Sequence, residues 1–276
     1  MIVERSVAAL RATIAGRGRV AFVPTMGSLH EGHLSLIDIA RDAGELVVVS
    51  VFVNPLQFAP NEDLASYPRD EERDISLLQE RGVDVVFAPS VETMYPEGAD
   101  TTVHVGGLGD QLEGAARPGH FDGVATVVVK LFNIVTPDVA VFGQKDAQQV
   151  AVIKKMVADL DIPVSIIVAP IVRAEDGLAL SSRNVYLAAE DRVRATALWL
   201  SLNAGRSALE AGEDLGGAEA AMRAVLEERG GIEVGYVAIV DPVTFGVPSS
   251  GEDVLLLVAA RLGSTRLIDN LLVERD

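Results

Sequence analysis

Hydrophobic positions in the first 170 residues form two kinds of pattern that follow one another in turn. Residues 19–25 and 45–53 are short apolar runs rich in β-branched side chains, which predicts two buried strands. Between them, residues 33–43 carry apolar Leu34 and Ile37 among polar positions, as an amphipathic helix does. The order strand, helix, strand predicts a βαβ unit with parallel strands.

The same alternation continues to residue 169. We expect further helices at residues 70–81, 122–135 and 146–160, and further strands at residues 83–88, 139–142 and 164–169. Strands that alternate with helices form a parallel sheet covered on both faces, which binds ligands at the carboxyl ends of its strands. The predicted fold class is therefore α/β, with a Rossmann-like parallel sheet and helices on both faces.

The order of the elements changes after Pro170. Helical patterns at residues 190–210 and 217–228 are followed by strand patterns at residues 234–240, 254–260 and 265–270. This order predicts a smaller α+β C-terminal domain over residues 172–276, after a Rossmann-like domain over residues 1–171. No linker rich in Pro or Gly marks the boundary, so a single decorated domain remains the alternative.

Composition and charge exclude several classes of protein. Of the 276 residues, 49% are hydrophobic and 23% are charged, which is typical of a folded protein rather than a disordered one. A formal net charge of -17 argues against binding to nucleic acid or to an anionic membrane surface. The absence of cysteine excludes disulfides, zinc–thiolate sites and a cysteine nucleophile. Apolar runs of strand length and an N-terminus without an apolar export segment lead us to expect a cytoplasmic protein.

The segment PTMGSLHEGH at residues 24–33 joins the first predicted strand to the first predicted helix. His30 and His33 are three residues apart, so they are expected on one face of a helix that begins near Gly32. The backbone N–H groups at the amino end of a helix bind anions such as phosphate. Gly27 and Gly32 let a ligand approach the backbone. A single histidine here is most often an ordinary polar residue, whereas the pair indicates a binding site.

One of the chain's few lysines lies at a comparable turn. Lys145, in FGQKD at residues 142–146, lies between a predicted strand and a predicted helix, where an ammonium group can neutralise phosphate oxygens. The alternative is a solvated helix start capped by Asp146. A third segment, LSSRN at residues 180–184, offers two hydroxyl groups and the guanidinium of Arg183 for phosphate contacts, although such loops are common.

Two further segments carry weaker signals. Gln57, in NPLQF at residues 54–58, offers a neutral donor and acceptor for a small polar substrate, unless it is only a turn residue. The segment at residues 113–121 is interpreted as a loop that leads into the next helix.

Familiar phosphate-binding and catalytic motifs are missing from the sequence. There is no Walker loop and no G-x-S-x-G elbow, and the glycines at residues 16 and 18 precede the first strand instead of following it. A zinc site is the weaker interpretation of the histidine pair, because the metalloprotease pattern needs a spacing of four. Cationic side chains nevertheless gather at several turns of an otherwise acidic chain. They indicate a cleft with a local positive charge that binds a small polyanion, most simply a nucleotide.

In this order, the segments resemble the pantothenate synthetase family, also called pantoate:beta-alanine ligases. The matching stretches also include VFVNPLQF at residues 51–58, YPR at residues 67–69 and RPGHFDGV at residues 117–124. The H-x-G-H element alone is shared by a wider nucleotidylyltransferase and class I aminoacyl-tRNA synthetase superfamily, but the ordered set is specific. The resemblance implies that ATP drives the condensation of pantoate with beta-alanine through a pantoyl adenylate, with release of AMP and pyrophosphate.

The family's residue roles, carried over to matching positions, imply a candidate site. His33 is the implied proton donor, and His30, Lys145 and Arg183 complete the implied catalytic set. Gln57 matches a glutamine shared by pantoate and beta-alanine, and Gln149 matches a second pantoate ligand. The implied ATP-binding residues are Met26, Gly27, His30, His33, Gly143, Lys145, Asp146, Val172, Leu180, Ser181, Ser182 and Arg183.

The resemblance further implies a homodimer, a C-terminal domain that acts as a lid, and Mg²⁺ that enters with ATP. The acidic residues Asp70, Glu71, Glu72 and Asp74 are candidate magnesium ligands, but the family pattern is loose there and no metal ligand is assigned. We expect magnesium to bridge the phosphates with mostly water ligands. Two alternatives remain: a nucleotidylyltransferase that leaves AMP on its product, and a non-catalytic nucleotide-binding module.

Overall fold

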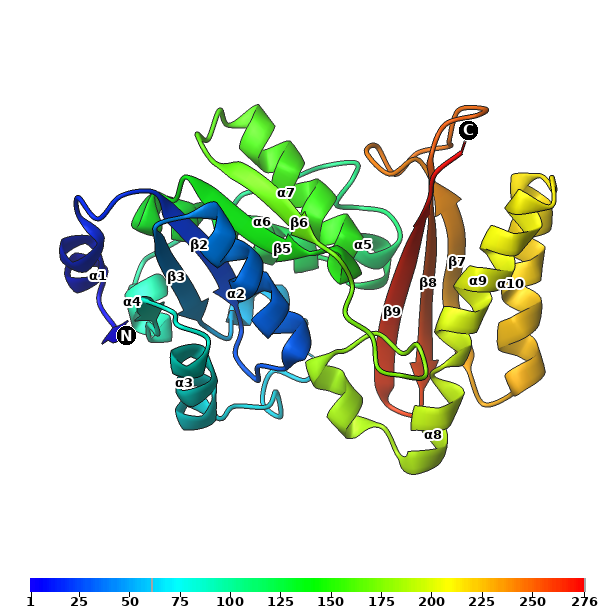
Figure 1. Ribbon diagram of the computed structural model, residues 1–276, viewed down its shortest axis with the longest axis horizontal. Helices are drawn as coiled ribbons and strands as arrows, with labels where there is room; N and C mark the ends of the chain where they lie inside the picture. The colour runs from blue at the N-terminus through cyan, green and yellow to red at the C-terminus, as the bar shows by residue number, and fades with distance from the viewer. Residues whose placement is uncertain (61, 276) are drawn as a thin grey trace. The chain divides into compact units, whose positions relative to one another are not determined.

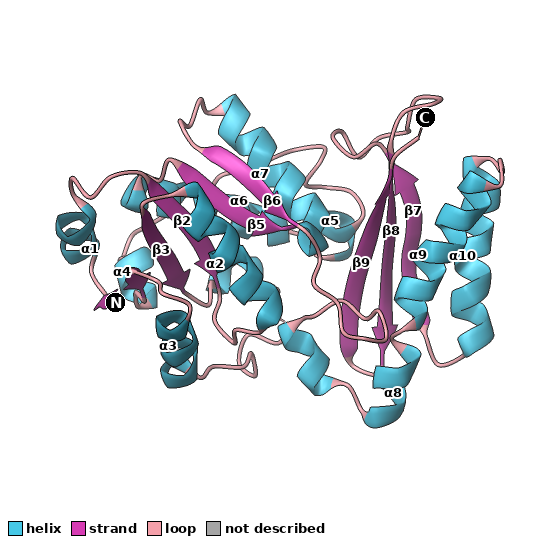
Figure 2. Ribbon diagram, viewed as in Figure 1, coloured by secondary structure: helices cyan, strands magenta, loops and turns pink. Residues whose placement is uncertain are grey.

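Six parallel strands form the sheet of the N-terminal part of the chain, in the order β1-β4-β3-β2-β5-β6 (Figure 1 and Figure 2). The computed structural model describes residues 1–60 and 62–275. The strands are β1 (Ile2–Glu4), β2 (Val20–Thr25), β3 (Leu46–Val51), β4 (Val85–Phe87), β5 (Val139–Gly143) and β6 (Ser165–Ala169). β2 pairs with β3 along its whole length, from Val20 opposite Leu46 to Thr25 opposite Val51.

Each face of this sheet has its own hydrophobic core, because successive side chains of a strand point to opposite faces. Phe22 and Val48 belong to the core that α1, α6 and α7 cover, whereas Val23 and Val49 belong to the core that α2 and α3 cover. Burial on both faces explains why these strands are continuous apolar runs in the sequence. The helices of this part are α1 (Val7–Ile14), α2 (Glu31–Ala43), α3 (Glu71–Glu80), α4 (Val91–Met94), α5 (Glu113–Ala116), α6 (His120–Val135) and α7 (Ala147–Asp159), with the 3-10 turn η1 (Pro55–Gln57).

β2 lies between β3 and β5 in the sheet. The chain runs outward from β2 through β3 to β4, and it then returns to form β5 on the other side of β2. The carboxyl ends of β2 and β5, at Thr25 and Gly143, therefore mark the point where the order of the strands reverses. Open α/β sheets bind their ligands at this kind of position.

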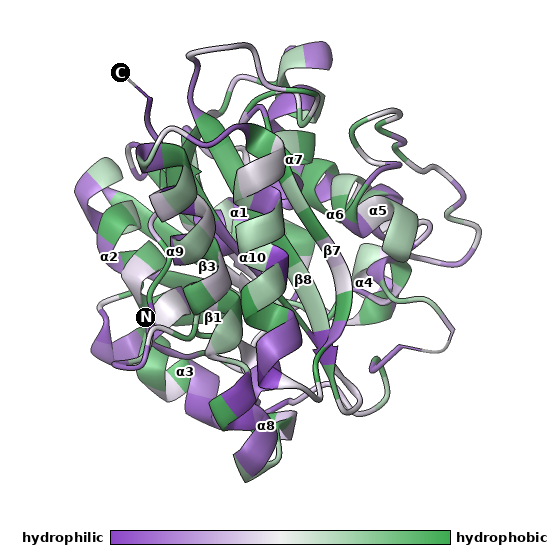
Figure 3. Cartoon of the chain, turned by 90° about the vertical axis from the view of Figure 1, so that its right-hand side faces the viewer, coloured by the Kyte–Doolittle hydropathy of each residue, from purple (hydrophilic) through white to green (hydrophobic). Residues whose placement is uncertain are grey.

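The C-terminal part contains an antiparallel sheet of order β7-β8-β9. The helices α9 (Ala197–Glu210) and α10 (Leu215–Arg229) lie side by side over one face of this sheet (Figure 1). They bury Leu202 and Met222 in a core shared with Leu256 of β8 (Val254–Leu262). α8 lies outside this pair and is mostly hydrophilic (Figure 3). The elements are η3 (Ser182–Tyr186), α8 (Ala189–Arg194), α9 (Ala197–Glu210), α10 (Leu215–Arg229), β7 (Glu233–Val240), β8 (Val254–Leu262) and β9 (Thr265–Val273).

Contacts within the chain define two compact units. The N-terminal unit comprises Met1–Gly143 and Gln148–Pro170, and the C-terminal unit comprises Gln144–Ala147 and the chain from Ile171 onward. The turn η2 (Gln144–Asp146) directly follows β5 in the sequence, yet it belongs to the C-terminal unit.

The predicted fold class is confirmed, since both the parallel sheet with helices and the separate small α+β part are present. The single helix predicted over residues 190–210 was wrong: α8 and α9 are separate helices. The Thr196 hydroxyl between them donates to the Val193 carbonyl at 2.8 Å, a local bond that competes with regular helix bonding. The sequence patterns did not predict β1, α4 or α5, which have only three or four residues each. Within the described residues, no helix has both the length and the apolar character needed to cross a bilayer.

Candidate active site

The turn between β2 and α2 brings His30 and His33 together. α2 begins at Glu31 with His30 as its N-cap, and the His30 Nδ1 atom accepts a hydrogen bond from the Gly32 N–H at 3.1 Å. Because Nδ1 accepts, the proton of the neutral His30 ring lies on Nε2. The two imidazole rings have centroids 4.1 Å apart, as the spacing of three predicts. The pair therefore lies at the end of the helix where the backbone attracts anions.

Asp74 of α3 holds the turn that precedes these histidines. Its carboxylate accepts from the Ser28 N–H at 2.7 Å and from the Leu29 N–H at 2.8 Å, and the side chain is almost completely buried. Gly27 and Ser28 both have positive φ, 79° and 53°, and such a conformation costs energy for a serine. A Cβ on Gly27 would lie 2.9 Å from the Asp74 carboxylate, so the close approach also requires glycine.

The acidic residues 70–74 do not form a group suited to magnesium. Asp70 caps α3 by accepting from the Arg73 N–H, and Glu71 forms an ion pair with Arg5. Asp74 is occupied by the two backbone N–H groups of the turn. Among residues 1–60 and 62–275, no group of three or more His, Cys, Asp or Glu side chains could hold a metal ion. The protein itself therefore uses three of these four carboxylates for structural contacts.

Gln57 is oriented by its neighbours toward the end of β2. Its Nε2 atom lies 3.1 Å from the Met26 sulfur, and its Oε1 atom accepts from Asn54 Nδ2 at 3.1 Å. Asn54 is buried and also donates to the Gly123 carbonyl, while its Oδ1 accepts from the Tyr95 hydroxyl at 2.8 Å. The amide of Gln57 is thus fixed beside Met26.

α6 approaches η1 closely because residue 123 is glycine. A Cβ at Gly123 would lie 2.3 Å from the Leu56 carbonyl oxygen and 2.6 Å from the Gln57 nitrogen. Any side chain at this position would displace η1 or α6. The absence of a side chain at Gly123 therefore permits the close packing of α6 against the turn that carries Gln57.

Arg117 and His120 hold the backbone of Gln57. Arg117 forms two bonds to the Glu62 carboxylate at 2.6 and 2.7 Å, and its Nη1 atom lies 3.0 Å from His120 Nε2. The Nδ1 atom of His120 lies 2.8 Å from the Gln57 carbonyl. A carbonyl can only accept, so the His120 proton is on Nδ1 and Nε2 accepts from Arg117.

This network shifts the pKa of both titratable groups. Burial, together with the charge of Arg117, lowers the pKa of His120 to about 4, which keeps the ring neutral at physiological pH. Burial by itself raises the pKa of Glu62, but the hydrogen bonds and the charge of Arg117 outweigh burial and lower it overall. The network therefore consists of one ion pair and one neutral imidazole.

A second group of predicted residues lies in the C-terminal unit. Val172 and Leu180 are joined by a backbone hydrogen bond of 3.0 Å, which closes the loop between them. Ser181 caps η3 by accepting from the Arg183 N–H at 3.3 Å. Lys145 is mostly buried, and its Nζ atom lies 3.7 Å from the Asp146 carboxylate.

The predicted site residues thus form two sets, one in each unit. The N-terminal unit carries Met26, Gly27, His30, His33, Gln57, Gly143 and Gln149, and the C-terminal unit carries Lys145, Asp146, Val172, Leu180, Ser181, Ser182 and Arg183. Gln149 is half-buried near the start of α7. Its neighbour Gln148 is buried and bonds the carbonyls of Leu108 and Gln111, so it has a structural role.

Sequence reasoning missed several residues that shape the site. It gave no role to Asn54, Arg117 or His120, and it grouped Asp74 with candidate metal ligands. The position of the first three within motifs was a signal, because they lie inside the segments at residues 51–58 and 117–124 that match the family. No local signal could have paired Asp74 with Ser28, which is 46 residues away.

Comparisons with known proteins agree with the fold and the motifs. A family model described as pantoate-beta-alanine ligase matches residues 2–272. The chain is 52% identical to the pantothenate synthetase of Gluconobacter oxydans, an alignment that covers 98% of this chain and 99% of the relative. It is 55% identical to the enzyme of the same name from Mycolicibacterium smegmatis, over 94% of this chain and 82% of that one.

Solved structures give the same result. A crystal structure of pantothenate synthetase from Thermus thermophilus has a TM-score of 0.94 and 51% identity, and the match covers 98% of this chain and 99% of that one. Pantoate-beta-alanine ligase from Francisella tularensis, complexed with beta-gamma ATP and beta-alanine, has a TM-score of 0.82 and 35% identity over 99% and 97% of the two chains. By sequence, motif order and fold, this chain is an enzyme that belongs to the pantoate-beta-alanine ligase family.

Proposed function

We propose that this enzyme condenses pantoate with beta-alanine in two steps driven by ATP. In the first step a pantoate carboxylate oxygen attacks the α-phosphorus of ATP, the bond to the β-phosphate oxygen breaks, and pyrophosphate leaves. In the second step the beta-alanine amine attacks the acyl carbon of pantoyl adenylate. The amine loses a proton, AMP leaves with the oxygen that came from the carboxylate, and pantothenate is the product.

The observation that carries this proposal is the histidine pair at the start of α2, beside the end of a central strand. Attack at phosphorus needs charge neutralisation and orientation more than covalent chemistry. His30 and His33 offer ring N–H groups next to a helix end that binds anions. In the proposed reaction His33 donates a proton as pyrophosphate departs, and Lys145 and Arg183 stabilise the charge of the phosphates.

Gln57 is proposed to bind the acyl substrates. Its amide is neutral, is held by Asn54, and is positioned beside Met26 at the end of β2. A fixed amide both donates and accepts, as recognition of a hydroxy acid and of an amine requires. Gln149 is proposed as the second pantoate ligand, and the residues that the family resemblance implies for ATP are proposed to bind the nucleotide.

Magnesium is proposed to enter with ATP and to offset phosphate charge when it is bound. The phosphate oxygens and water supply the ligands in this proposal, because three of the four acidic residues at positions 70–74 are used in structural contacts. No protein side chain is assigned to the metal.

Isotope exchange tests the order of the two steps. If pantoate is adenylated first, labelled pyrophosphate exchanges into ATP in the presence of pantoate and the absence of beta-alanine. Adding beta-alanine then yields free AMP and an amide. Exchange that does not need pantoate, or AMP retained in the final product, would favour a nucleotidylyltransferase instead.

We also propose that the enzyme works as a homodimer in the cytoplasm, which rests on the family resemblance. Sedimentation equilibrium with the intact protein measures the first point, and a mass of about 29.2 kDa would reject the dimer. Cell fractionation measures the second.

A further inference from the structure

The turn that carries Lys145 is anchored by the far end of the chain. Gln144–Ala147 belongs to the C-terminal unit, although β5 and most of α7 on either side belong to the N-terminal unit. The turn therefore needs contacts within the C-terminal unit that hold it there. Asn270 of β9 supplies them.

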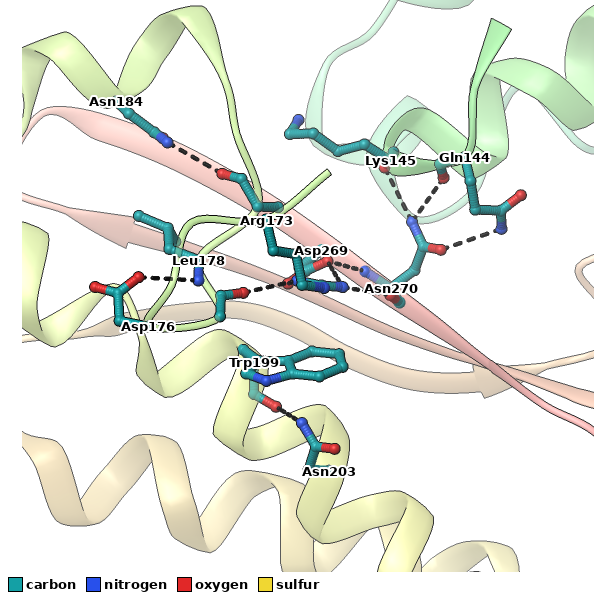
Figure 4. A network of polar contacts seen from close by, with 12 residues as sticks. Gln144, Lys145, Arg173, Asp176, Leu178, Asn184, Trp199, Asn203, Asp269 and Asn270 are labelled. Carbon is teal, nitrogen blue, oxygen red and sulfur yellow. Dashed lines mark hydrogen bonds and ion pairs between the residues drawn. The ribbon is translucent and has the colours of Figure 1, made fainter. Parts of the chain in front are cut away.

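The Asn270 side chain bonds the turn through all of its polar groups. Its Nδ2 atom donates one hydrogen to the Gln144 carbonyl at 2.9 Å and the other to the Lys145 carbonyl at 3.0 Å. Its Oδ1 atom accepts from Gln144 Nε2 at 3.1 Å. Only 2% of Asn270 is exposed, so water cannot easily replace these bonds. One amide thus fixes two consecutive carbonyls of the turn (Figure 4).

Asn270 is itself held rigidly by its neighbours (Figure 4). Its backbone N–H donates to Asp269, whose buried carboxylate pairs in two places with Arg173 at 2.6 and 2.9 Å. The Arg173 guanidinium also donates to the Asn270 carbonyl and stacks on the Trp199 ring, 3.9 Å from its centroid. An ion pair of this geometry, with an aromatic ring against it, restricts both partners.

We propose that Asn270 is a positioning residue for Lys145, acting by fixing the backbone of the turn that carries the ammonium group. This inference rests on the proposed role of Lys145 in binding ATP phosphates. A lysine has a long, flexible side chain, so its charge is directed only if its backbone is fixed. Displacement of a catalytic group by about 1 Å can cost a factor of about 100 in rate. The hydrogen bonds by which Asn270 fixes the turn are all formed within the C-terminal unit.

A double-mutant cycle with Lys145 tests the proposal. Asn270→Ala should reduce the rate of pantoate-dependent pyrophosphate exchange by about tenfold to a hundredfold, mainly in kcat. In the Lys145→Ala background the same change should cost less than about twofold, because a positioning residue has nothing left to position. Hydrogen exchange measured by mass spectrometry should also become faster at residues 144–147 in Asn270→Ala.

Asn203→Ala is the matched control. Asn203 also donates its side-chain amide to a backbone carbonyl in the C-terminal unit, that of Trp199, but it has no bond to the turn. The control should leave the exchange rate and the protection of residues 144–147 unchanged. If Asn270→Ala does not fold, Gln144→Ala removes one of the three bonds from the side of the turn and enters the same cycle.

The possible results separate this inference from the proposed function. Equal losses from Asn270→Ala in both backgrounds, or unchanged protection of the turn, would overturn the inference while leaving the role of Lys145 intact. Full activity of Lys145→Ala alone would reject the proposed role of Lys145 and, with it, the inference. A loss confined to the background that contains Lys145, together with a loosened turn, would establish the positioning role.

Discussion

Arg117 donates a hydrogen bond to Nε2 of His120, with 3.0 Å between the two nitrogens. A protonated His120 would bring a second positive charge against this guanidinium and would lose its acceptor. Burial and this contact explain why the pKa of His120 falls to about 4. The neutral imidazole is the form that holds the Gln57 carbonyl.

The stability of the protein should therefore fall below pH 6.5 through His120. Between pH 6.5 and 4 the unfolded chain binds the proton and the folded chain does not, so stability decreases as the pH is lowered. Between pH 7 and 5 this contribution is about 2 kcal/mol. Urea unfolding of the wild type and of His120→Asn at both pH values measures it, because the difference between the two chains should shrink by this amount.

His104 provides a control of opposite sign. It is exposed, and its hydrogen bond to Asp122 raises its pKa, so its contribution is present at low pH and is lost as the pH rises. His104→Asn should therefore shift stability with pH in the opposite direction. Identical pH slopes for the wild type and His120→Asn would contradict the assignment of a neutral His120.

Asp74→Ala should destabilise the protein by roughly 2 kcal/mol or more, because two backbone N–H groups lose their buried acceptor. The left-handed conformation of Ser28 would also lose its support. Asp38→Ala is the control: this exposed carboxylate pairs with Arg81, and its loss should cost less than about 1 kcal/mol. Urea midpoints measure both, and equal values for the two variants would refute the role of Asp74.

Lys145→Ala should slow adenylation by a factor of about 100 or more, since the variant would lose the preorganised contact proposed between Lys145 and the reacting phosphate. Lys155→Ala is the matched control, because Lys155 is half-exposed on α7 and pairs with Asp159 one turn further along the helix. Pyrophosphate exchange measures the step. Near-normal exchange by a folded Lys145→Ala protein would show that the lysine has no part in it.

His33→Ala and Gln57→Ala should separate the two half-reactions. His33→Ala should abolish most pyrophosphate exchange and still allow supplied pantoyl adenylate to react with beta-alanine, because the histidine is proposed to act at phosphorus. Gln57→Ala should impair both steps, because its amide is proposed to bind both substrates. Product formation from supplied pantoyl adenylate distinguishes the variants, and equal loss in that assay would refute the separation.

The sequence by itself determined the architecture and the family, and it predicted where the candidate site lies. Buried strands such as Leu46–Val51 are apolar on both faces, and α2 has the periodicity of an amphipathic helix, so local patterns suffice to predict them. The order of the motifs indicated the family, and the spacing of His30 and His33 predicted their shared position. These properties depend on residues that are close together in the chain.

Only the tertiary structure decided which hydrogen-bond partners these residues have and how the pKa of His120 is shifted. Asp74 is hydrogen-bonded to Ser28, which lies 46 residues away in the sequence, and Asn270 is hydrogen-bonded to Gln144, which lies 126 residues away. No periodicity in the sequence relates residues at such separations. The low pKa of His120 likewise depends on burial and on the direction of Arg117, which exist only after folding. Hydrogen bonds and desolvation are set by neighbours in space, and for these residues the neighbours come from distant parts of the chain.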